Sequence, residues 1–234
     1  MIIVIAAAMQ EELVPFRDTY RIQSILKRGK TVIEEVLDQP DYSLFLVETG
    51  IGKANAAASA SLLCEMIQPD VIINTGSAGG FLGEVEIGDV VYGTKLAYSD
   101  VDATGFDYTF GQVPQMPRDY RLSQRWLEIF NYLEKPSNYD LYNGLIVTSD
   151  SFMSESAFVT KVKEHFPEVK ASDMESTAIA QVASFYDIPV LNIRGISDIV
   201  GSEAAESFEI HLRKAALHAF QETKRLIRVL VEDK

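Results

Sequence analysis

Three carboxylates stand beside apolar runs that are long enough to form buried strands. Glu12 and Asp198 each follow a β-branched run, and Glu175 lies in the polar segment Ser172–Ser176, just before an apolar helix. Because the carboxyl ends of parallel strands share one edge of a sheet, we expect the three side chains to converge on one crevice. Each has an ordinary alternative, since an acidic residue in the first turn of a helix interacts with its dipole or caps it. Found together, the three favour a site.

A pair of carboxyl groups is the usual equipment for hydrolysing a glycosidic bond. One protonates the leaving group and the other activates water on the opposite side of the sugar. A purine leaves best when N7 is protonated as the bond breaks, and burial beside other carboxylates would keep that proton in place near neutral pH. Other chemistries lack their residues. His165, His211 and His218 are expected as ordinary surface or helix residues away from strand ends, and no His/Cys cluster has metal spacing.

Strand-like and helix-like segments alternate along the chain. We expect strands at 2–5, 31–37, 42–47, 71–75, 90–94, 144–148 and 190–193. We expect helices from 9 onward and at 50–67, 122–133, 156–165, 172–185 and 203–231. This alternation is typical of an α/β fold with a central mixed, mostly parallel sheet flanked by helices. No repeat or low-complexity linker divides the chain, so one domain over residues 1–234 is expected.

Two glycine-rich turns close expected strands. Thr49–Lys53 resembles a phosphate-cradling loop at a helix start, and Asn74–Gly80 ends a buried strand. Neither has the full spacing of a dinucleotide or nucleoside triphosphate fingerprint. Each turn is either a tight turn that lets the backbone pack closely, or a surface of amides and hydroxyls for a sugar or base.

Composition limits the class of protein. The 234 residues are 47% hydrophobic and carry a net charge of -13, which argues against nucleic acid or an anionic membrane as partner. Cys64 has no second cysteine to pair with and is expected in the core. The apolar segment Met1–Met9 is too short to span a membrane and lacks the flanks of a signal peptide, so the cytoplasm is expected.

Five segments together resemble the successive motifs of the 5′-methylthioadenosine/S-adenosylhomocysteine nucleosidases, in the purine nucleoside phosphorylase superfamily. The resemblance covers nearly the whole chain, and its motifs follow in order as Ala8–Glu12, Thr49–Lys53, Asn74–Gly80, Ser172–Ala178 and Arg194–Asp198. The resemblance implies a three-layer αβα fold and a cofactor-free enzyme of methionine salvage. Its reaction would be hydrolysis of the N-glycosidic bond, releasing adenine and 5-methylthioribose or S-ribosylhomocysteine.

The resemblance also implies roles for individual residues. Glu12 would be the base that activates water, and Asp198 the acid on adenine N7, supported by Ser197 and Ser77. Glu175 would bind the ribose hydroxyls. The remaining implied substrate contacts are Met9 with Ile51 and Phe208 in the ribose and 5′-thio pocket, Met174 against the ribose, Phe152 stacked on adenine, the Met153 backbone at its edge, Ala78 and Gly79 in the turn, and Arg194 bracing the carboxylates.

The family also carries a loop from a neighbouring subunit into the 5′ pocket. Phe106 and Pro114 match that loop, which implies a homodimer. Two segments depart from the usual family pattern, Ser99–Asp102 and Ser149–Ser151, and neither contains the implied acid or base.

Other functions stay open on the sequence alone. The phosphorylase relatives place an Arg where this chain has Asn74, and no cation lies in Val71–Phe81, so a catalytic phosphate would meet Glu12 and Glu175 without a clamp. The alternatives are a hydrolase of a related nucleoside such as aminodeoxyfutalosine, a phosphorylase revealed by phosphate dependence, and a nucleoside-binding protein that leaves its ligand intact.

Overall fold

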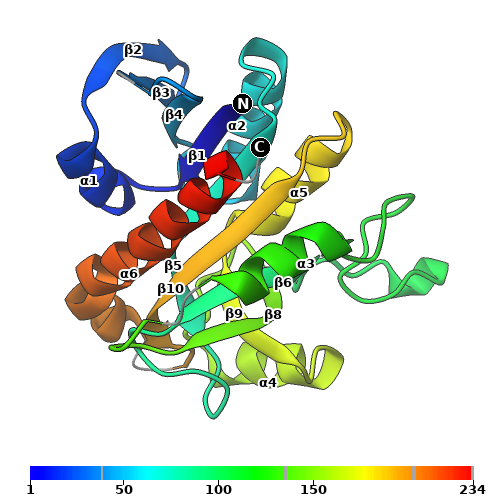
Figure 1. Cartoon of the computed structure of the whole chain (residues 1–234). Helices are drawn as coiled ribbons and strands as arrows, with labels where there is room; N and C mark the ends of the chain where they lie inside the picture. The colour runs from blue at the N-terminus through cyan, green and yellow to red at the C-terminus, as the bar shows by residue number, and fades with distance from the viewer. Residues whose placement is uncertain (38, 134–135, 202–203, 233–234) are drawn as a thin grey trace.

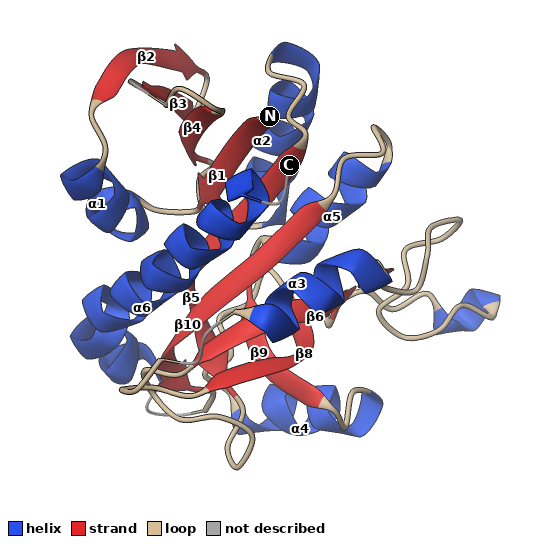
Figure 2. Ribbon diagram, viewed as in Figure 1, coloured by secondary structure: helices blue, strands red, loops and turns tan. Residues whose placement is uncertain are grey.

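The computed structural model describes residues 1–37, 39–133, 136–201 and 204–232, and its centre is a ten-stranded sheet (Figures 1 and 2). The strands are β1 (Ile2–Ala7), β2 (Ile22–Arg28), β3 (Thr31–Val36), β4 (Ser43–Glu48), β5 (Val71–Gly80), β6 (Val90–Tyr98), β7 (Tyr120–Arg121), β8 (Leu141–Thr148), β9 (Val169–Asp173) and β10 (Val190–Ile199). The helices are α1 (Gln10–Thr19), α2 (Lys53–Met66), η1 (Thr104–Phe106), α3 (Gln124–Tyr132), α4 (Ser156–His165), α5 (Ser176–Ser184) and α6 (Ala204–Glu232).

The sheet is mixed and partly closed on itself. β5 pairs with β10 in parallel, and the circuit continues through β6, β8 and β9 back to β5. From β5 the sheet also extends outward through β1, β4, β3 and β2. The α/β fold with a mixed sheet between helices is therefore confirmed.

Side chains alternate between two apolar layers. Ile3 and Ile5 of β1 belong to the core that holds α1, α3 and α6, whereas Val4 and Ala6 belong to the core that holds α2 and α5. This is the period of two expected for a strand covered on both faces. Figure 1 shows the long helix α6 crossing one face of the sheet, with α2 and α5 on the far side. A third cluster packs α4 on Phe81.

Several elements differ from the sequence prediction. β2 was not predicted because it is an edge strand with little buried apolar surface. The helix expected from Ser172 begins at Ser176. Ser172 and Asp173 instead end strand β9, where the Asp173 carboxylate accepts a hydrogen bond from the buried Thr148 hydroxyl. The predicted start of α6, Glu203, lies outside the described residues.

Two strands extend beyond their expected ends into the polar motifs. β5 includes the whole Asn74–Gly80 segment, and β10 includes Ser197 and Asp198. The register between them shifts between Ile196 and Asp198, a bulge that redirects the side chains at this edge. The apolar parts of both strands were predicted. Backbone pairing extends both strands through glycine and serine residues, which weaken the strand pattern in the sequence.

None of the helices in the described part of the chain has the length and apolar character of a membrane span.

Candidate active site

A cavity of about 350 Å³ opens at the carboxyl ends of β1, β5, β9 and β10. Most residues predicted for the site lie in its wall: Met9, Glu12, Ile51, Ser77, Ala78, Gly79, Phe152, Met174, Glu175, Ser197, Asp198 and Phe208. The expected convergence of the three carboxylates is thus found in the structure. Glu12, Glu175 and Asp198 are each less than 5% exposed.

Four predicted residues do not line this cavity. Met153 is buried and borders a smaller hollow that shares Gly79 and Asp198 with the main one. Arg194 lies beneath the cavity floor and is 1% exposed. Phe106 and Pro114 lie on the segment after β6, which extends away from the body of the molecule (green in Figure 1), and both are exposed.

Sequence reasoning gave no role to five lining residues, which are Ala8, Ser172, Asp173, Ala205 and Glu209. Ala8, Ser172 and Asp173 stand inside motifs that were recognised. Ala205 precedes Phe208 by three residues on α6, a spacing that places both on one face of a helix and could have identified it. The three histidines lie on helices outside the cavity wall, as predicted, although His218 is buried with Nδ1 against the Gly88 carbonyl.

Glu12 is held by four donors. Its Oε1 accepts the backbone N–H and the hydroxyl of Ser77 at 2.7 and 2.8 Å. Its Oε2 accepts the backbone N–H groups of Ala8 and Met9 at 3.0 and 3.2 Å. An ionised carboxylate is an acceptor only and matches this set, so the chain has placed a fixed anion against the cavity. Its neighbour Glu11 is exposed, which settles which of the two faces the site.

Gly76 makes room for that anion. The residue has φ +145°, and a Cβ there would lie 2.4 Å from Glu12 Oε1. We expect Gly76→Ala to displace Glu12, lowering kcat/KM about 10²-fold, and to cost roughly 1–3 kcal/mol of stability through its backbone conformation. Steady-state kinetics with a urea unfolding curve measures both. Gly83→Ala is the matched control, because its φ is +78° and its Cβ would meet nothing within 4 Å. Equal kinetic loss in both variants would contradict the contact.

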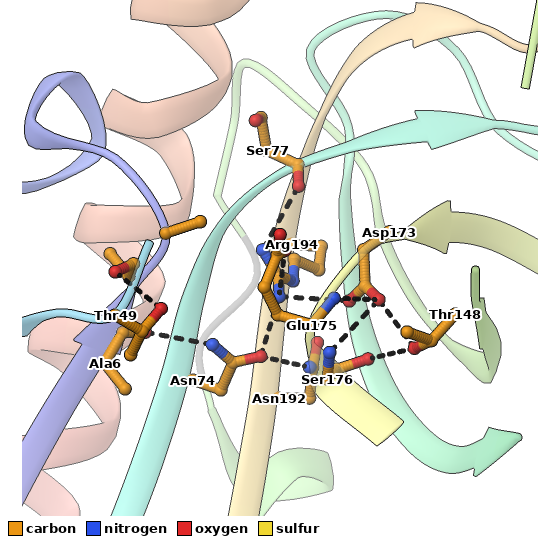
Figure 3. Close-up of polar contacts among 12 residues, drawn as sticks. Ala6, Thr49, Asn74, Ser77, Thr148, Asp173, Glu175, Ser176, Asn192 and Arg194 are labelled. Carbon is orange, nitrogen blue, oxygen red and sulfur yellow. Dashed lines mark hydrogen bonds and ion pairs between the residues drawn. The ribbon is translucent and has the colours of Figure 1, made fainter. Parts of the chain in front are cut away.

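A buried cation underlies the carboxylates (Figure 3). Nη2 of Arg194 lies 3.0 Å from Asp173 Oδ2 and 3.7 Å from Glu175 Oε2. The same nitrogen donates to Asn74 Oδ1 at 2.7 Å, and Nη1 donates to the Ser77 carbonyl at 3.3 Å. A buried charge needs such partners, because desolvation would otherwise disfavour its burial. Arg194 thus lies against Asp173 and Glu175, beneath the cavity.

Asn74 orients this cation. Its Nδ2 donates to the Ala6 carbonyl at 3.0 Å, which turns its Oδ1 toward Arg194, and Asn192 donates to the same oxygen at 2.9 Å. Asn74 is fully buried and does not line the cavity. The side-chain amide of Asn74 therefore contacts Arg194 beneath the cavity and does not face the cavity itself.

The surroundings of Glu175 and Asp198 favour the protonated form of each carboxyl group. Burial, reinforced by the nearby Asp173 carboxylate and opposed by Arg194, raises the pKa of Glu175 to about 7. Oε1 of Glu175 accepts the Gly52 N–H at 3.0 Å. Burial also raises the pKa of Asp198, and the 2.7 Å hydrogen bond from the Ser197 hydroxyl offsets only part of this. The site therefore sets a carboxylate with four donors opposite a carboxyl group that favours its protonated form.

Comparison with known proteins places this arrangement in a family. The sequence model that represents the Phosphorylase superfamily matches residues 2–228 of this chain. The chain belongs to the phosphorylase superfamily. A 5′-methylthioadenosine/S-adenosylhomocysteine nucleosidase of Geobacillus sp. (strain WCH70) is 42% identical over 226 residues, covering 94% of each chain.

Solved structures agree. That of the nucleosidase of the same name from S. pneumoniae with a transition-state inhibitor has a TM-score of 0.91 and 35% identity, covering 98% of this chain and 100% of that one. The nucleosidase from Colwellia psychrerythraea 34H, in complex with adenine, has a TM-score of 0.91 and 32% identity, over 97% and 94% of the two chains. The resemblance to these nucleosidases is confirmed.

In this member of the phosphorylase superfamily, the described part of the cavity wall consists of apolar, small polar and acidic residues. Among the described lining residues there is no Lys, Arg or His, whereas Glu12, Asp173, Glu175, Asp198 and Glu209 all contribute carboxyl groups. Arg194, the nearby buried cation, is already engaged by Asp173 and Glu175. Seating a phosphate dianion among these groups would be strongly unfavourable.

Proposed function

We propose that this enzyme hydrolyses the N-glycosidic bond of 5′-methylthioadenosine and S-adenosylhomocysteine. The observation that carries the proposal is the contrast between Glu12 and Asp198 in one cavity, which supplies a base and an acid. Relatives that are named for the same two substrates, such as that of Geobacillus sp., support the proposal.

The reaction needs two proton movements. Glu12 accepts a proton from a water molecule, and the oxygen of that water attacks C1′ of the ribose. The bond from C1′ to N9 breaks, its electron pair passes into the purine, and Asp198 delivers a proton to N7. Adenine and the free thioribose result, and the proton held by Glu12 returns to Asp198 through solvent. Each carboxyl group thus starts the cycle in the form that its surroundings favour.

The cavity wall fits a nucleoside with an apolar 5′ substituent. Phe152 and Phe208 lie with ring centroids 6.0 Å apart and close one side. Met9, Ile51 and Met174 provide further apolar surface. We assign Phe152 to stacking on adenine, Met174 to the ribose, and Met9, Ile51 and Phe208 to the 5′-thio group.

Release of adenine from methylthioadenosine in phosphate-free buffer tests this function. We expect free adenine and 5-methylthioribose at a rate that added phosphate leaves unchanged, because the described cavity wall offers no cation to hold phosphate. Release only with phosphate would establish a phosphorylase. No release of adenine would indicate another nucleoside substrate or a binding protein. Competition by aminodeoxyfutalosine would rank that substrate against the other two.

Glu175 is expected to bind the ribose hydroxyls. Glu175→Gln should lower kcat/KM about 10–100-fold, because an amide N–H group replaces one of the two carboxyl oxygens that face the ribose hydroxyls. An unchanged kcat/KM on methylthioadenosine would contradict the ribose contact.

The same variant tests the charge of Glu175. Its folded pKa is raised from 4.5 to about 7, so its contribution to stability is present below pH 4.5 and is lost as the pH rises toward 7. Thermal unfolding of wild type and Glu175→Gln across this range should show wild type losing stability relative to the variant. A difference in Tm that does not vary with pH would contradict the raised pKa.

A homodimer completes the proposal. Phe106 is 80% exposed and remote from its own cavity, which fits a role in a neighbour's 5′ pocket. Phe106→Ala should raise KM. Mixed dimers of the Phe106→Ala and Asp198→Asn variants should recover activity, because in one of their two sites the Phe106→Ala subunit supplies an intact acid and the Asp198→Asn subunit supplies an intact loop. No recovery after subunit exchange would refute the shared site. A cytoplasmic location and a role in methionine salvage remain predictions from the sequence.

A further inference from the structure

Three charged residues beside the cavity come from motifs to which the proposed function gives no role. Lys53 is the first residue of α2, Asp100 follows β6, and Asp150 follows β8. Nζ of Lys53 lies 2.7 Å from Asp100 Oδ2 and 3.8 Å from Asp150 Oδ2. The backbone N–H of Asp150 donates to Asp100 Oδ2 at 3.0 Å. Lys53, Asp100 and Asp150 therefore close a ring of contacts, here named the charged clasp.

The clasp reaches the cavity through the first amides of α2. The N–H of Lys53 donates to Asp150 Oδ1 at 2.7 Å, and the preceding N–H, that of Gly52, donates to Glu175 Oε1 at 3.0 Å. Gly52 has φ +92°, and a Cβ there would lie 3.1 Å from Asp150 Oδ1. Two successive backbone amides, those of Gly52 and Lys53, thus donate to Glu175 in the cavity and to Asp150 in the clasp. Any shift of Asp150 moves the donor on which Glu175 depends.

Asp150 also holds one wall of the cavity. Phe152 lies two residues further on, and its segment begins where the Ser149 N–H donates to the Asp173 carbonyl at 3.1 Å. Asp150 is the next residue, and its carboxylate joins this segment to α2. Ile51, just before α2, lines the cavity as well. The clasp therefore fixes the distance between the Ile51 and Phe152 walls.

We propose that the charged clasp positions the Gly52 amide on Glu175 and the Phe152 wall around the substrate. Lys53, Asp100 and Asp150 are then positioning residues for the nucleoside, a reading that rests on the proposed function for the identity of the ligand. Their side chains are 23%, 21% and 54% exposed, and ion pairs so accessible to water contribute little to folding. Breaking the clasp should therefore affect the site far more than the stability of the fold.

Asp150→Ala is the first test. We expect kcat/KM on methylthioadenosine to fall about tenfold or more, because small displacements of positioning groups have large kinetic effects. Asp150→Asn should recover most of this loss, since its amide oxygen can still accept the Lys53 N–H. Glu168→Gln is the matched control, because it breaks a partly exposed ion pair, 2.9 Å from Lys95, that lies outside the cavity wall. It should keep the wild-type rate.

A double-variant cycle separates positioning from general destabilisation. If Asp150 acts through Glu175, then Asp150→Ala combined with Glu175→Gln should lose less than the product of the two single losses. Multiplicative losses, a rate for Asp150→Ala within twofold of wild type, or equal loss in Asp150→Asn and Asp150→Ala would each overturn the proposal. Wild-type hydrolysis is measured alongside, so that failure of the proposed function appears in the wild type and failure of the clasp in the ratios.

Discussion

Asp198→Asn is expected to lower kcat about 10²–10⁴-fold with little change in substrate affinity, because the proton donor acts only as the bond breaks. Asp198 is 2% exposed, and burial raises its pKa, which favours the protonated form that a proton donor needs, whereas asparagine has no acidic proton to deliver. The Ser197 hydroxyl can still donate to the amide oxygen, so the variant should keep its fold. Single-turnover adenine release and thermal unfolding measure the two effects.

The pH dependence and the leaving group sharpen that test. The wild-type kcat should fall as the pH rises through the raised pKa of Asp198, since the acid then loses its proton, and the variant should lack this limb. A thioriboside with 4-nitrophenolate as leaving group needs no proton and should be cleaved almost equally by both enzymes. Asp18→Asn, an exposed aspartate on α1, is the control. Near-normal adenine release by Asp198→Asn would remove Asp198 from the role of acid.

Glu12→Gln should lower kcat by a similar factor, about 10²–10⁴-fold, because the attacking water loses its base. The structure predicts a second effect. Both oxygens of Glu12 accept from N–H or O–H donors, so the amide nitrogen of glutamine must face either Ser77 or the amides of Ala8 and Met9. Two donors then meet, and we expect about 1–3 kcal/mol of lost stability.

Urea unfolding and steady-state kinetics together test this prediction. Glu11→Gln is the matched control, since the same chemical change occurs one residue earlier on an exposed side chain. It should keep both activity and stability. A stable and active Glu12→Gln enzyme would contradict both the four-donor arrangement and the role of base, whereas loss of stability alone would contradict only the role of base.

Most of the strands and helices, and the three carboxylates, could be predicted from the sequence because they depend on local patterns. The β-branched run Ile2–Ile5 must be covered on both faces, and helices alternate with such runs, so a sheet between helices is the arrangement that buries them. A polar segment that follows such a run is expected at the sheet's carboxyl edge, and Glu12 and Asp198 each lie in one. Glu12 and Asp198 could therefore be placed in one crevice before any contact was known.

Only the tertiary structure decided which partners these carboxylates have. The buried Arg194 on β10 meets Asp173 on β9 and Asn74 on β5 across the closed circuit of strands, and no local pattern encodes that closure. Strand β9 itself ends in Ser172 and Asp173, which are poor strand formers, and the buried Asp173 carboxylate finds Thr148 and Arg194 as partners only in the folded chain. Sequence patterns report which faces are apolar, whereas a pKa and a paired charge depend on distances between segments far apart in the chain.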